Sequence, residues 1–369
     1  METANRAQGF VGGRAEDLLW FVGGAALSIA AGALVLAVPS LLAPLFWLWL
    51  LLVDGPHLVA TWSRTYLDPA ERRRRGPLLG YSLLWLLPGP LAVLAARASG
   101  SRAPWDAFLL FAVLWAFHHA VRQNYGILSI YQRHASATPR ARRLDSLFLY
   151  FFFWALFAGF AVLHPDGRIT LGLAPGLSPA ELLAAKSGLA LFFSLSLLYA
   201  VELTLRGRRG EPLRPVLIAL LPPVAVIAFV YFVVGPREPL LPRCTSAEQL
   251  FLTMGLAGGV LHGLQYLGLV FIANRRRAET SGAGLFGTLA RAPLRAWLLF
   301  VAISIGYVAL NAARGIGPGY QPFPIEGDTA RLFIALYWGL FFHHYYLDQK
   351  IWRPGADAAL RKELGLEPA

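Results

Sequence analysis

The sequence predicts an all-α integral-membrane protein, a polytopic bundle of about ten transmembrane helices with both termini on the cytoplasmic side. Three observations predict this fold class. The chain is 56% hydrophobic and only 15% charged, whereas soluble domains carry roughly 25% charged residues. Apolar runs long enough to cross about 30 Å of hydrocarbon recur along most of its 369 residues. The basic residues are also distributed unevenly between alternate loops.

Ten apolar segments are the expected spans. They lie at residues 18–38, 41–63, 77–97, 105–130, 145–164, 182–204, 214–235, 248–273, 294–314 and 329–350. An outer-membrane barrel would instead show alternating segments of about ten residues. Because the loops are short, we expect a single integral-membrane domain over residues 1–369 that ends in a cytoplasmic tail at 355–369. The single Cys244 excludes a disulfide framework and any CxxC motif.

The positive charges set the expected topology. With the N-terminus inside and the sides alternating, 24 of the 33 Lys and Arg residues fall on the inside and 6 on the outside. This excess of positive charge on one side is typical of cytoplasmic loops. It favours a multi-pass protein of a bacterial-type inner membrane. The net charge of +12 is therefore assigned to topology and lipid headgroups, and no nucleic-acid partner is expected.

Ionisable side chains concentrate in four of the ten spans, at 41–63, 105–130, 248–273 and 329–350. Six of the eight histidines lie there: His57, His118, His119, His262, His343 and His344. All four spans are expected to run from outside to inside, with the histidines in or near the inner half. A buried ionisable group in lipid costs several kcal/mol unless it has a partner. A shared metal centre is therefore the favoured interpretation.

Helical spacing adds candidate residues to the histidines. Asp54 lies three residues before His57, and Asp348 lies four residues after His344, so each pair shares a helix face. Helical bundles present carboxylate and imidazole ligands to di-iron sites in this way. The two aspartates are expected to be ligands or to orient an imidazole. Four further residues are expected to be supporting polar groups: Gln123, Gln265, Tyr125 and Tyr266.

Ligand chemistry limits the choice of metal. Imidazole with carboxylate and without thiolate suits iron, zinc or copper. About six imidazoles favour a dinuclear centre, and iron is the expected metal. Adjacent histidines point about 100° apart on a helix, so only one of each adjacent pair is expected to face a single ion.

A histidine cluster near the cytoplasmic side of a helical membrane protein resembles the integral-membrane desaturases and hydroxylases with di-iron centres. The resemblance is one of chemistry and sidedness, and the His-x-x-His-His boxes of those enzymes are absent, so no residue role is carried over. It implies a metal-dependent oxidoreductase that hydroxylates, desaturates or cleaves a lipid-soluble substrate from the bilayer. A separate electron donor is expected, because the sequence has no flavin or nicotinamide motif. The sequence does not identify a catalytic residue.

Two other functions stay open at this stage. One is a haem protein that transfers electrons, with His57, His119, His262 and His344 as two pairs of axial ligands. The other is a proton or solute transporter. Transporters often show inverted repeats, whereas the sequence has only a faint echo between segments 119–126 and 262–268, in helices of the same orientation.

Overall fold

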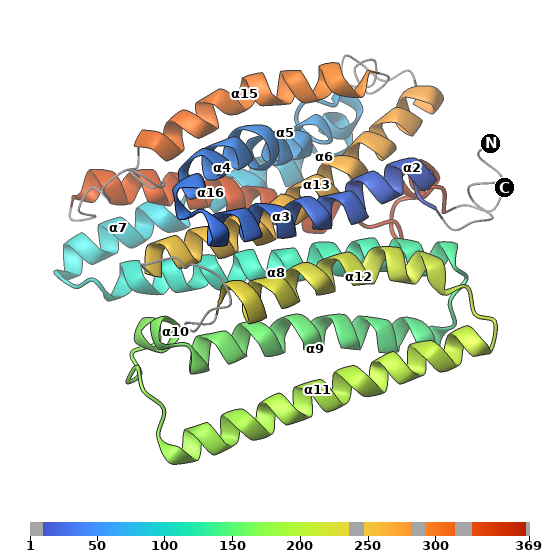
Figure 1. The fold of residues 1–369 in the computed structure, drawn as a ribbon. Coiled ribbons are helices and arrows are strands. Elements are labelled where there is room, and N and C mark those ends of the chain that lie inside the picture. The colour runs from blue at the N-terminus through green and yellow to red at the C-terminus, as the bar shows by residue number, and fades with distance from the viewer. Residues whose placement is uncertain (1–9, 236–246, 282–291, 314–326, 367–369) are drawn as a thin grey trace. The chain divides into compact units, whose positions relative to one another are not determined.

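The computed structural model describes residues 10–235, 247–281, 292–313 and 327–366, and within these ranges the chain is helical without strands (Figure 1). The predicted all-α class is confirmed. The chain forms two compact units, each assembled from two stretches of sequence. The first unit contains residues up to Leu42 and Gln123–Leu261, and the second contains Ala43–Arg122 and His262 onwards. The predicted single domain over 1–369 stays a prediction.

Eight helical segments are long and apolar enough to cross a membrane, which indicates a multi-pass membrane protein. They are Arg14–Ala37, Pro39–Ser63, Pro69–Ser99, Ala103–His134, Pro139–Leu163, Pro179–Arg208, Leu213–Val234 and Gln249–Glu279. The last two predicted spans are also helices, α15 (Pro293–Ala313) and α16 (Asp328–Ile351). They do not join the eight: the apolar run described in α15 is short, and α16 carries several polar residues. The total of ten spans and the sidedness of the termini stay predictions.

The first unit is built on four whole helical spans and on parts of others. Its elements are α2 (Arg14–Asp17), η1 (Leu18–Gly23), α3 (Gly24–Ala37), η2 (Pro39–Leu41), α9 (Pro139–Leu163), α10 (Pro165–Thr170), α11 (Pro179–Arg208), α12 (Leu213–Phe229) and η5 (Val230–Val234). It also contains parts of α8 (Ala103–His134) and α13 (Ala247–Ser281). Helix α12 packs on α3 and α9, and α9 also packs on α10 and α11 (Figure 1).

Side-chain capping defines where two of these helices begin. Thr138 accepts a hydrogen bond from the Ala141 amide at the start of α9. Ser178 and Glu181 form a reciprocal capping box at the start of α11. Such boxes satisfy two amides that the first helical turn leaves unpaired, so the long apolar segments begin at defined residues.

The second unit holds all six histidines of the four polar spans. Its own elements are η3 (Leu50–Asp54), α5 (Gly55–Ser63), α6 (Pro69–Ser82), η4 (Leu83–Leu86), α7 (Pro88–Ser99), α15, α16 and α17 (Ala358–Glu363), with most of α4 (Leu42–Trp49). Helix α5 packs on α15 and α16, and α16 packs on α7. At Gly89 of α7 an added Cβ would lie 2.6 Å from the Cβ of Ala335. Glycine is needed there because the two helix backbones approach closely.

The segment before His57 departs from regular α-helix. Residues Leu50–Asp54 form a π-helical turn, η3, and Pro56 follows in the first turn of α5. π-Helical turns are frequent at functional sites. An added Cβ at Gly263, next to His262, would lie 2.5 Å from Cγ1 of Val53 in this turn. The absence of a side chain at residue 263 therefore lets α13 approach η3.

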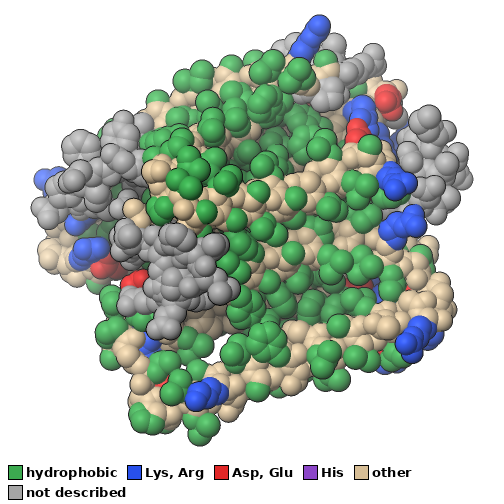
Figure 2. All heavy atoms as spheres, viewed as in Figure 1, with side chains coloured by type: hydrophobic (Ala, Val, Ile, Leu, Met, Phe, Trp, Pro, Cys, Tyr) green, Lys and Arg blue, Asp and Glu red, His purple; other side chains and the backbone are tan. Residues whose placement is uncertain are grey.

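Hydrophobic side chains dominate the surface that Figure 2 shows, while Lys and Arg gather towards the ends of helices. On α11, Leu183, Leu197 and Leu198 are 67%, 66% and 63% exposed. Leucines this exposed are unfavourable in water but ordinary against lipid tails. The outer face of α11 is therefore suited to contact with the bilayer.

Candidate metal centre

Four histidines of the second unit converge from four helices. They are His57 on α5, His119 on α8, His262 on α13 and His344 on α16. One ring nitrogen from each lies within 4.8 Å of the others, and Nε2 of His57 and Nε2 of His344 are 2.7 Å apart. These residues are called the four-histidine group below. The prediction that imidazoles from separate spans converge is confirmed for these four.

The four rings form a closed arrangement in which each contacts two others or more. Ring centroids are 4.4 Å apart for His57 and His344, 4.8 Å for His57 and His262, 5.1 Å for His119 and His262, and 5.0 Å for His119 and His344. Three of the four side chains are almost fully buried, with exposed fractions of 1% for His57, 3% for His119 and 0% for His344. The group is thus enclosed by protein rather than spread over a surface.

Each adjacent histidine pair contributes one member to the group. His119 and His344 belong to it, whereas the Nε2 atom of His343 lies 2.9 Å from the hydroxyl of Tyr66. His118 is half-buried and also lies outside the group. The 100° step between neighbouring helical residues explains this separation. Of the six histidines predicted as ligands, the structure brings four together.

Asp348 presents one carboxylate oxygen to the group. Its Oδ2 lies 3.5 Å from Nε2 of His344 and 3.9 Å from Nε2 of His119. Its Oδ1 accepts hydrogen bonds from the hydroxyl of Tyr266 at 2.6 Å and from Oγ1 of Thr61 at 3.3 Å. Because the two hydroxyls hold one oxygen, the other faces the imidazoles in a fixed orientation.

Thr61 is a member of the site that the sequence analysis did not assign. Its Oγ1 lies 2.7 Å from Nδ1 of His344 and 2.7 Å from the hydroxyl of Tyr266. Trp352 extends this series of hydrogen bonds, because its Nε1 donates to the Tyr266 hydroxyl at 3.3 Å. The signal for Thr61 was present, because it lies four residues after His57 and shares its helix face.

Tyr345 also belongs to the surroundings of the group. Its ring stacks on that of His119 with centroids 4.2 Å apart and planes 22° apart. This stacking on one face of the imidazole limits the rotation of the His119 ring. Tyr345 is buried, with 5% of the side chain exposed.

Buried polar atoms in and beside the group lack hydrogen-bond partners among the described residues. Nε2 of His119 has no hydrogen bond, and neither does either polar atom of Gln265. A buried donor or acceptor without a partner costs about 1–3 kcal/mol. A metal ion and its bound water or substrate would supply partners, so the residues present fit a metal.

The other predicted site residues have different surroundings. Asp54 accepts a hydrogen bond from the hydroxyl of Tyr307 on α15. Gln123 and Tyr125 belong to the first unit, where the ring of Tyr125 contacts Tyr150 with centroids 5.6 Å apart. Their roles beside a metal stay predictions.

An ion-pair network closes the second unit at the end where α17 lies. Arg64 donates to Glu363 at 2.6 Å, and its guanidinium lies 5.2 Å from the centre of the Trp352 ring. Arg277 reaches the same carboxylate at 3.2 Å. Trp352 is thus in contact with both the network and Tyr266, so the network supports the residues around Asp348.

Asp357, the N-cap of α17, is part of the same network. Arg74 and Arg75 both donate to its carboxylate, Arg75 at 2.7 Å. Burial alone would raise the pKa of Asp357, but the hydrogen bond from Arg74, the Leu360 amide and the two positive charges lower the pKa to about 2. The arginine run at 72–75 therefore holds the C-terminal helix as well as carrying positive charge.

The chain matches no protein-family model, no curated protein and no solved structure. The functional argument therefore rests on the residues and their geometry.

Proposed function

We propose that this protein is a membrane-embedded metalloenzyme that uses the four-histidine group to oxidise a lipid-soluble substrate. Iron would be held by His57, His119, His262 and His344, with Asp348 as a further ligand or as the residue that orients His344. The observation that carries the proposal is the convergence of four ring nitrogens within 4.8 Å, in a chain whose helices are apolar enough to cross a membrane.

The donor set supports iron, with zinc and copper as the alternatives. Imidazole nitrogens suit all three metals, and the carboxylate of Asp348 adds one hard oxygen donor. Four imidazoles and one carboxylate are enough for a single ion. We therefore favour one ion per chain over the dinuclear centre that six imidazoles had suggested. Iron supplies the oxygen chemistry needed to attack an unreactive C–H bond, by hydroxylation, desaturation or oxidative cleavage.

The residues of the chain would position and balance the ion. The negative charge of Asp348 offsets part of the metal's charge in a region of low dielectric constant, where an isolated cation is costly. With its own hydrogen donated to Asp348, the hydroxyl of Thr61 would accept a hydrogen bond from Nδ1 of His344, which would leave Nε2 available as a ligand. The substrate would enter from the bilayer of a bacterial-type inner membrane, and electrons would come from a separate protein.

The haem alternative is disfavoured by the crowding of the group. A porphyrin between two axial histidines needs a flat space about them, and here each ring has two more imidazoles within about 5 Å of its centre. A Soret band in the purified protein would overturn the non-haem proposal. Its absence together with bound iron would support it.

The adjacent histidine pairs provide matched variants for the decisive test. We expect His119→Ala and His344→Ala to lower the metal content of the purified protein at least tenfold, because each removes a member of the group. His118→Ala and His343→Ala should retain the metal, since neither residue belongs to the group. Elemental analysis with an absorption spectrum measures both metal identity and the number of ions per chain.

The experiment has two outcomes that would overturn the proposal. One is wild-type protein, expressed in iron-supplemented medium, that contains no transition metal. The other is an unchanged metal content in His119→Ala and His344→Ala when size-exclusion chromatography shows that both variants are folded.

A further inference from the structure

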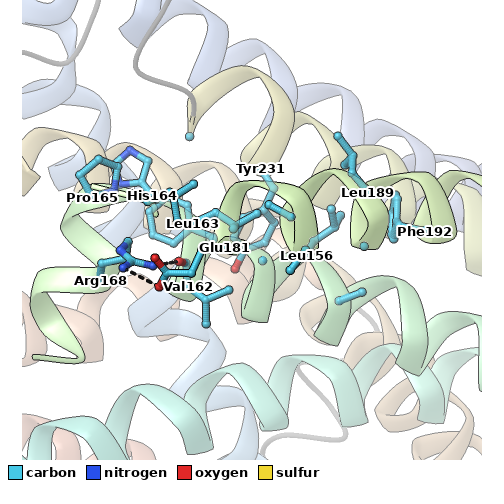
Figure 3. Close-up of a pocket in the computed structure, with 18 of the residues that line it drawn as sticks. Leu156, Val162, Leu163, His164, Pro165, Arg168, Glu181, Leu189, Phe192 and Tyr231 are labelled. Atoms are coloured by element: carbon cyan, nitrogen blue, oxygen red, sulfur yellow. Dashed lines mark hydrogen bonds and ion pairs between the residues drawn. The ribbon is translucent and has the colours of Figure 1, made fainter. Parts of the chain in front are cut away.

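The first unit contains a cavity of about 890 Å³ between α9, α11 and the end of α12. Its volume is in the range of ligand-binding pockets. Its lining is mostly apolar and includes Leu156, Phe160, Leu163, Leu189, Phe192 and Phe232. Figure 3 shows Leu156, Leu189 and Phe192 towards one end and Arg168 with Glu181 towards the other. This cavity is called the α9–α11 groove below.

Small residues keep the groove open. Gly159 on α9 and Gly188 on α11 both line it, and an added Cβ at either position would meet no atom within 4 Å. Both helices are long and apolar enough to cross a membrane. A void beside them would lose the dispersion contacts that close packing provides. In a bilayer, a hydrocarbon chain is the material available to fill it.

The polar end of the groove is balanced in charge. Arg168 is 4% exposed; it donates from Nη2 to Glu181 at 3.0 Å, from Nη1 to the carbonyl of Val162 at 3.0 Å, and from Nε to the carbonyl of Ala174. Because Glu181 neutralises the guanidinium, the groove has no excess positive charge to attract a free anion. A guanidinium has five N–H groups, and three of them are used in these bonds. Arg168 can therefore donate a further hydrogen bond to the carbonyl oxygen of an ester.

The position of this end along the helices fits the edge of the hydrocarbon. Helix α11 begins at Pro179, and Glu181 immediately precedes the apolar stretch 182–204. The ester groups of a phospholipid lie at this boundary between acyl chains and headgroups. The apolar end lies at Leu156, about two turns before the end of α9, and at Phe192, more than three turns after the start of α11. This end is therefore nearer the interior of the bilayer.

We propose that the α9–α11 groove binds one acyl chain of a membrane phospholipid. The ester end lies beside Arg168, and the terminal methyl lies between Leu156 and Phe192. The site is separate from the four-histidine group, and its occupancy does not depend on the bound metal.

Substitution of either of two glycines would fill the groove with a side chain of the protein itself. Gly159→Phe and Gly188→Phe place a ring in the open space, and Gly80→Phe is the matched control. Gly80 is an exposed glycine of α6, outside the groove, where an added Cβ also meets no atom within 4 Å. The full-length protein is placed in nanodiscs that contain a phosphatidylcholine with a diazirine at the end of one acyl chain. After irradiation, mass spectrometry locates the labelled residues.

We expect the label to concentrate on the lining near Leu156 and Phe192, and to fall at least fivefold in both groove variants but not in Gly80→Phe. Equal labelling of these residues in wild type and in a folded Gly159→Phe or Gly188→Phe protein would overturn the proposal. So would labelling spread evenly over the outer leucines of α11. If diazirine-labelled palmitate displaces the phospholipid and extracts of the purified protein contain no phosphorus, the occupant is a free fatty acid and the phospholipid proposal is wrong.

Discussion

Asp348 links the imidazoles to the hydroxyl groups that surround them. One of its oxygens faces His119 and His344, and the other is bonded to Tyr266 and Thr61. The carboxylate therefore has a different chemical role on each side. Towards the hydroxyls one oxygen is a hydrogen-bond acceptor, and towards the imidazoles the other lies within 3.9 Å of two ring nitrogens.

The two aspartates predicted as site residues can be tested against each other. We expect Asp348→Asn to weaken metal affinity about 10- to 100-fold, the usual effect of removing a partner of a ligating histidine. Asp54→Asn should leave metal affinity within about threefold of wild type, because Asp54 bonds to Tyr307. Competition titration with a chromogenic chelator measures both affinities. Equal losses in the two variants would contradict the role assigned to Asp348.

At the scale of residues, the sequence predicted that imidazoles from four spans converge, but not which member of each adjacent histidine pair does so. Periodicity places His57, Thr61, His344 and Asp348 on shared faces, and the structure brings these faces together. The rotation of each helix about its axis determines whether His118 or His119 faces the group. That rotation depends on packing with other helices. Spacing alone carries no information about it, so Tyr307 as the partner of Asp54 was not predicted.

Among the structural elements, the close contact of α13 with η3 is the most sensitive to substitution. Gly263→Leu would place a side chain where Cγ1 of Val53 lies 2.5 Å from the Cβ position. Overpacking of this kind costs about 1–3 kcal/mol, and it would move the neighbouring His262. We expect metal content to fall at least tenfold, measured by elemental analysis of monodisperse protein. Gly80→Leu is the control and should retain the metal; full metal content in Gly263→Leu would show that the contact does not position His262.

The stability of the contacts that hold α17 should depend on pH. The folded-state pKa of Asp357, about 2, is lower than its value of about 3.9 in an unfolded chain. Its ion pairs therefore contribute their full stability above about pH 4 and lose it as the pH falls towards 2. Because the network is partly exposed, we expect a contribution of about 1 kcal/mol.

The measurement compares thermal unfolding of wild type and Asp357→Asn across pH. The variant should melt at a lower temperature at pH 6, and the difference should vanish near pH 2. A difference that stays constant over this range would contradict the assignment of the low pKa to the pairing with Arg74 and Arg75.

For the elements, the sequence predicted most helices and missed their irregularities. The ten apolar segments each correspond to helix in the structure, with α6 and α7 joined across η4 in the third. The π-helical turns η1, η3 and η5 have no clear signal in composition, because they arise from local hydrogen bonding and packing. In α16 the site residues themselves lower the apolar character, so α16, which contributes His344, is not among the eight helices of clear apolar character.

At the scale of the whole molecule, topology is the main prediction still to be tested. With ten spans, an epitope inserted in the Gly315–Gly327 loop lies outside, while a C-terminal tag lies inside. If only the eight helices of clear apolar character cross the membrane, both positions lie on the same side. We expect protease to reach the inserted epitope from the outside of intact cells but not the C-terminal tag. Protection of both would reduce the number of spans to eight. The inserted loop is outside the described residues apart from Gly327.

The second unit is made from two separate stretches of the chain, Ala43–Arg122 and His262 onwards, and this order has a consequence for biosynthesis. His57 and His119 are made early, whereas His344 follows only when most of the 369 residues have been joined. A ribosome that stalls before α16 leaves three imidazoles without their fourth neighbour and without Asp348. If the four-histidine group holds a metal, its full set of ligands is therefore present only after α16 has been synthesised.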